Sequence, residues 1–195
     1  MQRYKSININ DLNITYREEG RRQPVILVHG FASSSYTWLR LVRSLPPGFR
    51  YIALDLKGFG HSDKPLDKNY SAYDQAGILT EFINELDLDN VVIVGHSFGG
   101  IVSLVSLISN DIKNHVAGLI LINPVAYFTH IPDFIAKLRI PVGGMLGLDF
   151  FSTRELARQG LEEVFYDRSK ITEETISAYS ENLTLPEAKR SLIRR

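Results

Sequence analysis

Short, almost wholly apolar runs recur along the first part of the chain. Four of them, Val25–Val28, Tyr51–Leu54, Val91–Val94 and Val116–Ile122, are too short for helices and contain no charged residue. Strands that are covered on both faces have this composition, whereas strands with one wet face alternate apolar and polar residues. The runs therefore predict an α/β fold, with a mostly parallel sheet and helices on both of its faces.

The segments before these runs follow a different pattern. Tyr4–Ile9 and Asn13–Arg17 alternate between apolar and polar residues, and a short Asn-Asp turn separates them. Alternation of this kind is typical of strands with one solvated face. We expect an antiparallel hairpin at the N-terminus.

Amphipathic segments lie between the apolar runs. Apolar residues recur at helical spacing over Tyr36–Leu45, from Ser71 to about Leu86, and over Phe98–Ile108. Ser71 and Asp74 have the spacing of a capping box, in which a hydroxyl and a carboxylate satisfy the free N–H groups of a helix start. Each segment is predicted to be a helix that connects two strands.

The pattern changes after Asn123-Pro124, because residues 125–195 contain no further convincing strand. The chain is therefore predicted to have an α/β core over residues 1–123 and a helical annex over residues 124–195. Four helices are expected in the annex: Phe134–Leu138, Thr153–Tyr166, Glu173–Asn182 and Glu187–Ile193.

Composition narrows the classes of function. The 195 residues include 22 Lys plus Arg and 22 Asp plus Glu, so the net charge is zero and no basic surface for nucleic acid or an anionic membrane is predicted. Cysteine is absent, which excludes disulfides and thiolate chemistry. No cluster of His, Asp and Glu has metal-ligand spacing, and the Gly-rich segments fit no phosphate or dinucleotide fingerprint. We expect neither a metal nor a cofactor.

The segment Val91–Ser109 is uncharged and about as long as a membrane-spanning helix. Its β-branched first half and the Gly-rich interruption in its middle favour a buried strand, a tight turn and a buried helix instead. The N-terminus has no continuous apolar run after its basic residues, so no secretory signal is expected. These patterns predict a cytoplasmic protein.

The sequence Gly95-His96-Ser97-Phe98-Gly99 fits the pattern G-x-S-x-G, at the junction of a predicted strand and helix. That junction is the context the motif requires, because a serine on a sharp, strained turn projects its hydroxyl above the sheet. Glycine on either side lets the strand and the helix approach closely. The following helix N-terminus offers N–H groups to a developing oxyanion.

Two further stretches accompany this motif: HGF at residues 29–31 and DLKGFGHSD at residues 55–63. With GHSFGG at residues 95–100, they resemble the α/β-hydrolase superfamily in its esterase-like branch with a serine nucleophile. The resemblance implies that Ser97 is the nucleophile and that the N–H groups of Phe31 and Phe98 form the oxyanion hole. It also implies a small-molecule acyl substrate, such as a carboxylic ester, and identifies the helical annex with the family's cap or lid.

Serine at position 97 argues against the relatives that carry aspartate there, the haloalkane dehalogenases and most epoxide hydrolases of this fold. Three other residues of the motifs are expected to support the site rather than react. His29, beside Gly30, is predicted to hydrogen-bond the oxyanion loop in place, and His96 to pack beside the elbow. Asp55 is predicted to hydrogen-bond the glycine-rich turn that follows it.

A serine hydroxyl needs a base, and an acid that orients the base. The resemblance places both after the cap, yet only His115 and His130 follow Ser97. His115 is expected at the opposite end of the sheet and His130 near the start of the annex. Asn123 stands where some relatives carry the acid. We therefore expect a C-terminally truncated hydrolase that lacks the triad acid and histidine, with an unpaired apolar strand at one sheet edge.

Two alternatives remain open at this point. The chain could be a non-catalytic, ligand-binding relative of these enzymes. It could also be completed by a partner chain that supplies the missing histidine and acid.

Overall fold

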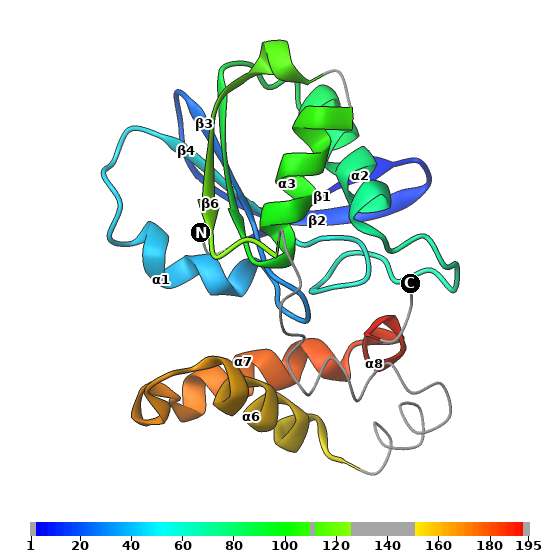
Figure 1. Ribbon diagram of the computed structural model, residues 1–195, viewed down its shortest axis with the longest axis vertical. Coiled ribbons are helices and arrows are strands. Elements are labelled where there is room, and N and C mark those ends of the chain that lie inside the picture. Colours follow the sequence, from blue (N-terminus) through cyan, green and yellow to red (C-terminus); the bar gives the residue numbers. More distant parts are fainter. Residues whose placement is uncertain (1–2, 110–111, 126–150, 193–195) are drawn as a thin grey trace. The chain divides into compact units, whose positions relative to one another are not determined.

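A six-stranded sheet with the order β1-β2-β4-β3-β5-β6 forms the centre of the first part of the chain (Figure 1). The computed structural model describes residues 3–109, 112–125 and 151–192. The chain divides into two compact units, Met1–Ala126 and Tyr127–Arg195, where the sequence predicted a boundary at residues 123/124. The strands of the first unit are β1 (Tyr4–Ile9), β2 (Leu12–Gly20), β3 (Pro24–Val28), β4 (Arg50–Leu54), β5 (Val91–His96) and β6 (Val116–Ile122).

The pairing pattern confirms the predicted fold class. β3 pairs in parallel with β4 and β5, and β5 pairs in parallel with β6. β1 and β2 form the predicted antiparallel hairpin. β2 is longer than predicted because its second half, Tyr16–Gly20, also pairs antiparallel with β4. Glu18 in that half bonds Lys5 and Arg50 on the neighbouring strands, which explains why so charged a stretch is a strand.

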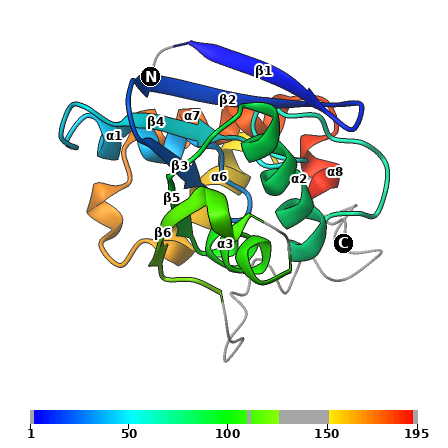
Figure 2. The same cartoon turned by 90° about the horizontal axis from the view of Figure 1, so that it is seen from above.

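Helices cover both faces of the sheet, as predicted. α1 (Leu39–Val42) lies on one side, and α2 (Ala72–Glu85) and α3 (Phe98–Ser109) lie together on the other (Figures 1 and 2). On the α1 side, Trp38 and Val42 pack with alternate residues of the strands into one buried cluster. On the other side, Phe82 of α2 is fully buried and meets the ring of Tyr16 edge-on at 5.2 Å.

The helix predicted over Tyr36–Leu45 is only partly formed. A 3₁₀ turn, η1 (Ser35–Trp38), leads directly into α1, which ends at Val42. The turn begins where the Ser34 hydroxyl accepts a hydrogen bond from the Tyr36 N–H. After Val42 the chain continues in tighter turns, in which the Ser44 N–H donates to the Leu41 carbonyl at 2.8 Å and the Leu45 N–H to the Val42 carbonyl at 3.2 Å.

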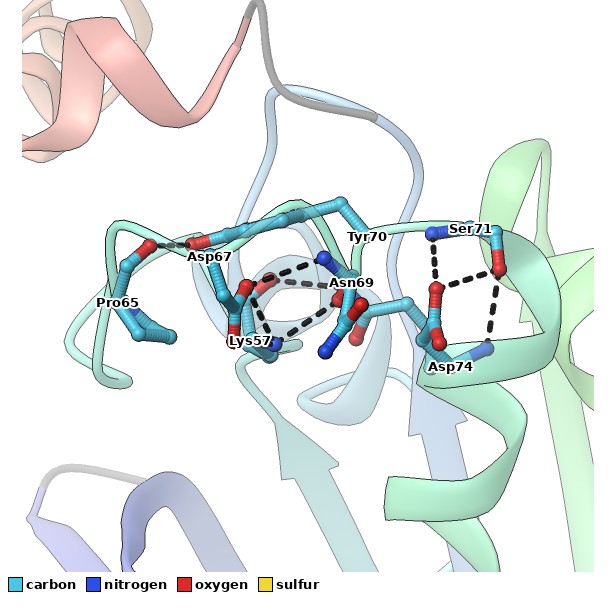
Figure 3. A network of polar contacts seen from close by, with 8 residues as sticks. Lys57, Pro65, Asp67, Asn69, Tyr70, Ser71 and Asp74 are labelled. Atoms are coloured by element: carbon cyan, nitrogen blue, oxygen red, sulfur yellow. Dashed lines mark hydrogen bonds and ion pairs between the residues drawn. The ribbon is translucent and has the colours of Figure 1, made fainter.

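The loop between β4 and α2 is fixed by a buried lysine (Figure 3). Lys57 Nζ donates to both oxygens of Asp67, at 3.0 and 2.8 Å, and to the Asn69 carbonyl at 2.9 Å. The same ammonium lies 4.8 Å from the centre of the Tyr70 ring. Since only 4% of the Lys57 side chain is exposed, these contacts replace nearly all of its hydration.

The loop ends at Ser71, where the predicted capping box begins α2. The Ser71 hydroxyl accepts from the Asp74 N–H, and the Asp74 carboxylate accepts from the Ser71 N–H (Figure 3). This arrangement satisfies donors that a helix start leaves free.

The second unit is helical. Its described elements are α6 (Thr153–Val164), η3 (Arg168–Lys170), α7 (Glu173–Thr184) and α8 (Ala188–Ser191). α6 and α7 confirm the helices predicted at those positions, and α8 is shorter than predicted. Arg154 and Arg158 of α6 both pair with Glu173 at the start of α7. The helix expected at residues 134–138 lies outside the described residues.

β6 is the outermost strand on its side of the sheet and pairs only with β5 within the described residues. Its exposed side chains are apolar, with Ile120 52% exposed and Leu121 and Ile122 more than one third exposed. The opposite edge strand, β1, carries Lys5 and other polar residues. The expectation of an unpaired apolar edge is thus met in the described part of the molecule.

The uncharged segment Val91–Ser109 forms β5 and α3. None of the helices in the described ranges has the length and apolar character needed to cross a bilayer.

Candidate active site

Ser97 occupies the sharp turn between β5 and α3, with φ of +52°. A residue other than glycine is strained there, because its Cβ crowds the backbone. Hydrogen bonds to α3 and to the end of β6 and the residues after it maintain this strained conformation. The Ser97 N–H donates to the Ile122 carbonyl at 3.0 Å, and the Ser97 carbonyl accepts from Gly100 at 3.0 Å and Val125 at 3.2 Å. The structure therefore confirms the elbow geometry predicted from the motif.

The two glycines that flank the elbow allow close approach, as expected. A Cβ on Gly95 would lie 2.6 Å from the Gly99 carbonyl oxygen and 2.7 Å from the Gly100 Cα. A Cβ on Gly99 would overlap the carbonyl oxygens of Val28 and His29. Real Cβ atoms do not approach backbone atoms so closely, so both positions require glycine.

The HGF segment lies directly beside the elbow. A Cβ on Gly30 would be 3.2 Å from the Ser97 Cβ and 3.1 Å from His96 Nδ1. The rings of Phe31 and Phe98 meet edge-on at 6.3 Å. The two N–H groups that the resemblance assigns to the oxyanion hole thus belong to neighbouring segments.

His29 is fully buried and hydrogen-bonded through both ring nitrogens. Its Nε2 accepts from the Leu56 N–H at 3.0 Å, so the proton of the neutral ring sits on Nδ1, which donates to the Gly30 carbonyl at 2.7 Å. Burial holds the pKa of the His29 imidazole below its ordinary value, although the charge of Asp55 opposes this. The contacts agree with the expected supporting position of His29 in the loop.

Asp55, at the end of β4, is also fully buried. Its Oδ1 accepts from the Ser35 N–H at 2.6 Å and its Oδ2 from the His61 N–H at 2.9 Å. A Cβ on Gly60 would overlap this carboxylate, which requires glycine at that position. The carboxylate was predicted to bond the glycine-rich turn at residues 57–60 and bonds His61, the residue directly after it; the bond to Ser35 was not anticipated.

His96 and His61 take no part in a charge relay with Ser97 in this structure. The His96 ring is half-buried beside Gly30, where burial lowers the pKa of its imidazole. The His61 ring lies 4.1 Å from the centre of the Tyr4 ring. Both positions fit packing better than proton transfer.

Among the described residues, the Ser97 hydroxyl has no hydrogen-bond partner, so no base is bonded to it there. His115 directly precedes β6 and pairs with Asp89 at 3.5 Å. Because β5 and β6 are parallel, His115 lies at the opposite end of the sheet from Ser97, as expected. Asn123 has φ of +42°, and His130 lies outside the described residues. In the described ranges, no group of His, Asp and Glu could hold a metal ion.

Three features of the site were not found from the sequence. They are the left-handed backbone of Ala32, with φ of +56°, the hydrogen bond from the Ser35 N–H to the Asp55 carboxylate, and the hydrogen bond from the Val125 N–H to the Ser97 carbonyl. The last two act through backbone atoms, which leave no mark in a one-dimensional pattern. Alanine is also not a residue that signals positive φ.

The family model described as alpha/beta hydrolase fold matches residues 23–161. The chain belongs to this family. The match begins just before β3 and spans the elbow, so it includes all three motifs described above.

Individual relatives show how much of the family's length the chain represents. It is 29% identical over 181 residues to the uncharacterized hydrolase YugF of Bacillus subtilis, which covers 90% of this chain and 64% of that protein. It is 31% identical over 146 residues to a soluble epoxide hydrolase of Corynebacterium, covering 73% of this chain and 48% of that protein. The mouse mesoderm-specific transcript protein is 38% identical over 106 residues, 51% of this chain and 32% of that protein.

Solved structures agree with this picture. The epoxide hydrolase CorEH superposes with a TM-score of 0.84 at 25% identity, covering 98% of this chain and 71% of that structure. An esterase from Exiguobacterium antarcticum superposes with a TM-score of 0.71 at 26% identity, covering 96% of this chain and 70% of that structure. The chain therefore spans between about a third and seven tenths of the length of these relatives.

Proposed function

We propose that Ser97 is the nucleophile of a serine hydrolase that acts on a carboxylic ester or related acyl compound. The observation that supports this most strongly is the strained elbow, which holds a serine, with φ of +52°, between β5 and α3. Strain of this kind persists only where surrounding contacts maintain it, and it is common at reactive residues. Relatives with solved structures include both an esterase and an epoxide hydrolase. The serine at this position favours the esterase type of chemistry.

In the proposed reaction, Ser97 Oγ attacks the carbonyl carbon of the ester and transfers its proton to a base. The tetrahedral oxyanion accepts hydrogen bonds from the N–H groups of Phe31 and Phe98. The carbon–oxygen bond to the alcohol then breaks, and the alcohol leaves with the proton. Water hydrolyses the acyl-enzyme by the same route and releases the acid.

The base and its orienting acid are proposed to come from polypeptide outside the described residues. The structure supplies no partner for the Ser97 hydroxyl within those residues. The relatives named above are longer than this chain, which leaves room in the fold for such residues. A further segment of the protein or a second chain could provide them.

The substrate side of the proposal rests on aromatic side chains around the elbow. The Phe31 ring lies 5.5 Å from Phe59 and 6.3 Å from Phe98, both edge-on. A wall of rings suits an apolar acyl or alcohol group. The alternative, a ligand-binding relative without turnover, uses the same apolar wall.

Labelling with a fluorophosphonate followed by mass spectrometry tests the proposal. We expect an adduct on Ser97 when polypeptide that supplies the base is present, and none in the Ser97→Ala variant. Slow labelling of the isolated chain that accelerates when a second polypeptide is added would support a base supplied in trans. No labelling under either condition, combined with binding of an ester analogue, would favour the non-catalytic alternative.

A further inference from the structure

β6 forms an open and uncharged edge of the sheet. None of its residues is charged, and within the described part of the chain it pairs only with β5. The opposite edge is β1, which carries Lys5 (Figure 2). A lysine on an edge strand discourages pairing with a further strand, whereas an uncharged apolar edge favours it. β6 is therefore the edge at which another strand can join this sheet.

A second copy of the chain offers a strand that fits this edge. Because β6 carries no charge, two β6 strands brought together place no like charges opposite each other. Ile120, Leu121 and Ile122 are each more than one third exposed, so pairing also buries apolar surface. The commonest oligomer of soluble proteins is a two-fold dimer, in which one patch meets its own copy. A two-fold axis perpendicular to the sheet at this edge makes the two β6 strands antiparallel.

The register of such a pair follows from the strand itself. The Ile122 carbonyl accepts from the Ser97 N–H, on the β5 side of the strand. Since the backbone groups of successive residues point to alternate sides of a strand, the N–H and carbonyl groups of Leu121 and Leu119 face the open edge. Leu119 is the central residue of β6, and placing it opposite its own copy pairs the full length of both strands. In this register, Asn123 of one copy lies opposite residue 115 of the other.

That register brings a histidine to the end of the sheet where the nucleophile lies. Within one chain, His115 and Ser97 are at opposite ends, because β5 and β6 run parallel. Antiparallel pairing reverses the order for the second copy, so the partner's His115 lies beside Asn123, at the level of Ser97. Two strand spacings then separate the Cα atoms of Ser97 and the partner's His115 by about 10 Å. A serine and an imidazole side chain that extend towards each other bridge this distance with a hydrogen bond of about 3 Å.

His115 also has the acid that a base requires. Its Nδ1 lies 3.5 Å from Asp89 Oδ1, and the two side chains are 47% and 78% exposed. A carboxylate beside Nδ1 favours the neutral tautomer with the proton on that nitrogen, which leaves Nε2 as the acceptor. This is the tautomer that takes a proton from a nucleophilic serine. The exposure of both side chains leaves them accessible to a second chain.

We propose that the chain forms a two-fold dimer through its β6 edges, in which the partner's His115 is the base for Ser97 and the partner's Asp89 orients that base. The inference rests on the proposed function, in which Ser97 is the nucleophile. As Ser97 Oγ bonds to the carbonyl carbon of the ester, its proton passes to Nε2 of the partner's His115. The same nitrogen gives the proton to the alcohol as the carbon–oxygen bond breaks. Water then follows the same route and releases the acid, and each dimer contains two equivalent sites.

Disulfide trapping tests the pairing without any reaction at Ser97. The chain has no cysteine, so each introduced thiol reports one position. His115→Cys mixed with Asn123→Cys should give a cross-linked dimer on mild oxidation. Neither variant alone should do so, because its two thiols lie at opposite ends of the paired strands. His115→Cys mixed with Tyr73→Cys, on α2, is the control for random collision. Cross-linking no faster than in this control would overturn the proposed pairing.

Complementation between two variants tests the base. His115→Gln should be labelled by a fluorophosphonate at Ser97 about 100-fold more slowly than wild type, as after loss of a general base. Ser97→Ala has no nucleophile to label. An equal mixture of the two variants should regain about one quarter of the wild-type labelling, because half of the dimers are mixed and each of these holds one complete site. A mixture no more reactive than His115→Gln alone would overturn the inference.

The two proposals fail in different ways. If His115→Gln is labelled as fast as wild type, the inference is wrong and Ser97 remains the nucleophile. If Ser97 is never labelled in wild-type dimers that the cysteine pair can trap, the proposed function is wrong as well. Ile120→Lys should reduce both association and labelling, whereas Tyr73→Lys should change neither.

Discussion

The carboxylate of Asp55 accepts a 2.6 Å hydrogen bond from the backbone N–H of Ser35, 20 residues earlier in the chain. The same carboxylate accepts from the His61 N–H through its other oxygen. One buried side chain thus joins the start of η1 to the loop after β4. Asp55 therefore fixes the loop after β3 relative to the loop after β4.

Replacing Asp55 by asparagine should destabilise the protein by about 2–3 kcal/mol. The amide keeps one oxygen acceptor, but its NH₂ faces the second backbone donor, which remains buried and unpaired. Urea unfolding measures the loss. Asp63→Asn is the matched control, because one oxygen of Asp63 accepts both bonds from Asn13 at an exposed site. If the two variants lose equal stability, the two hydrogen bonds of the Asp55 carboxylate do not stabilise the fold more than an exposed pair does.

Stability should fall as the pH drops below about 6.5, the ordinary pKa of histidine. Burial depresses the pKa of His29 and of His96 in the folded protein, so the unfolded chain binds protons first. Their contribution is complete above pH 6.5 and is lost as the pH falls towards the folded-state pKa, at about 1.4 kcal/mol per unit of depression. Urea titrations between pH 5 and 8 should show this slope, and His29→Asn should flatten it. An unchanged slope would contradict the assignment to His29.

A methyl group at position 99 should be far more costly than one at position 77. The Cβ of Gly99→Ala would strike the carbonyls of Val28 and His29, which are backbone atoms at the end of β3 and directly after it, so we expect a loss of about 3 kcal/mol. Gly77, inside α2, has nothing within 4 Å of its Cβ position. Gly77→Ala should stabilise the protein by about 0.5–1 kcal/mol through helix propensity. Thermal and urea unfolding of the two variants should therefore differ in sign.

Removing the ammonium of Lys57 should cost about 2 kcal/mol. Lys57→Met retains the length of the side chain but removes the donor to the Asn69 carbonyl and leaves the Asp67 carboxylate with only the Asn69 N–H as a donor among the described residues. Asp67 is partly exposed, so water replaces some of the loss. Lys5→Met removes a surface ion pair and should change the free energy of unfolding by less than about 1 kcal/mol. A Lys57→Met protein as stable as wild type would show that the loop needs no such anchor.

The free edge of β6 should promote association between chains. Uncharged, apolar edge strands pair readily with other strands, and Ile120 is 52% exposed on this one. Sedimentation at rising concentration should show association that Ile120→Lys reduces. Tyr73→Lys replaces an aromatic residue on α2 that is even more exposed, at 69%, and should leave the association unchanged. A wild-type chain that stays monomeric at high concentration would contradict this prediction.

The sequence was sufficient for the parts of the fold that depend on local pattern. The buried strands around Ile26, Ile52 and Ile93 follow from apolar runs, and the capping box at Ser71 follows from two side chains three residues apart. The elbow at Ser97 could also be predicted, because its geometry dictates glycine on either side. In each case the physical requirement lies within a few residues.

Features that depend on tertiary contacts escaped prediction. β2 extends to Gly20 because it pairs with β4, although its own second half is charged. The bond from Ser35 to Asp55 joins a backbone atom to a side chain across 20 residues, and no periodicity encodes such a pair. Long-range hydrogen bonds decide these features.

The backbone of Ser97 bonds to Ile122 and Val125, which lie well after it in the chain. A nascent chain that has produced only β5 and α3 therefore has no partner for the N–H of its serine and lacks one of the donors to its carbonyl. The turn at Ser97 has all of these hydrogen bonds only after β6 and the three residues behind it have left the ribosome and paired. In the order of synthesis, Ser97 is made early and gains the hydrogen bonds that fix its backbone late.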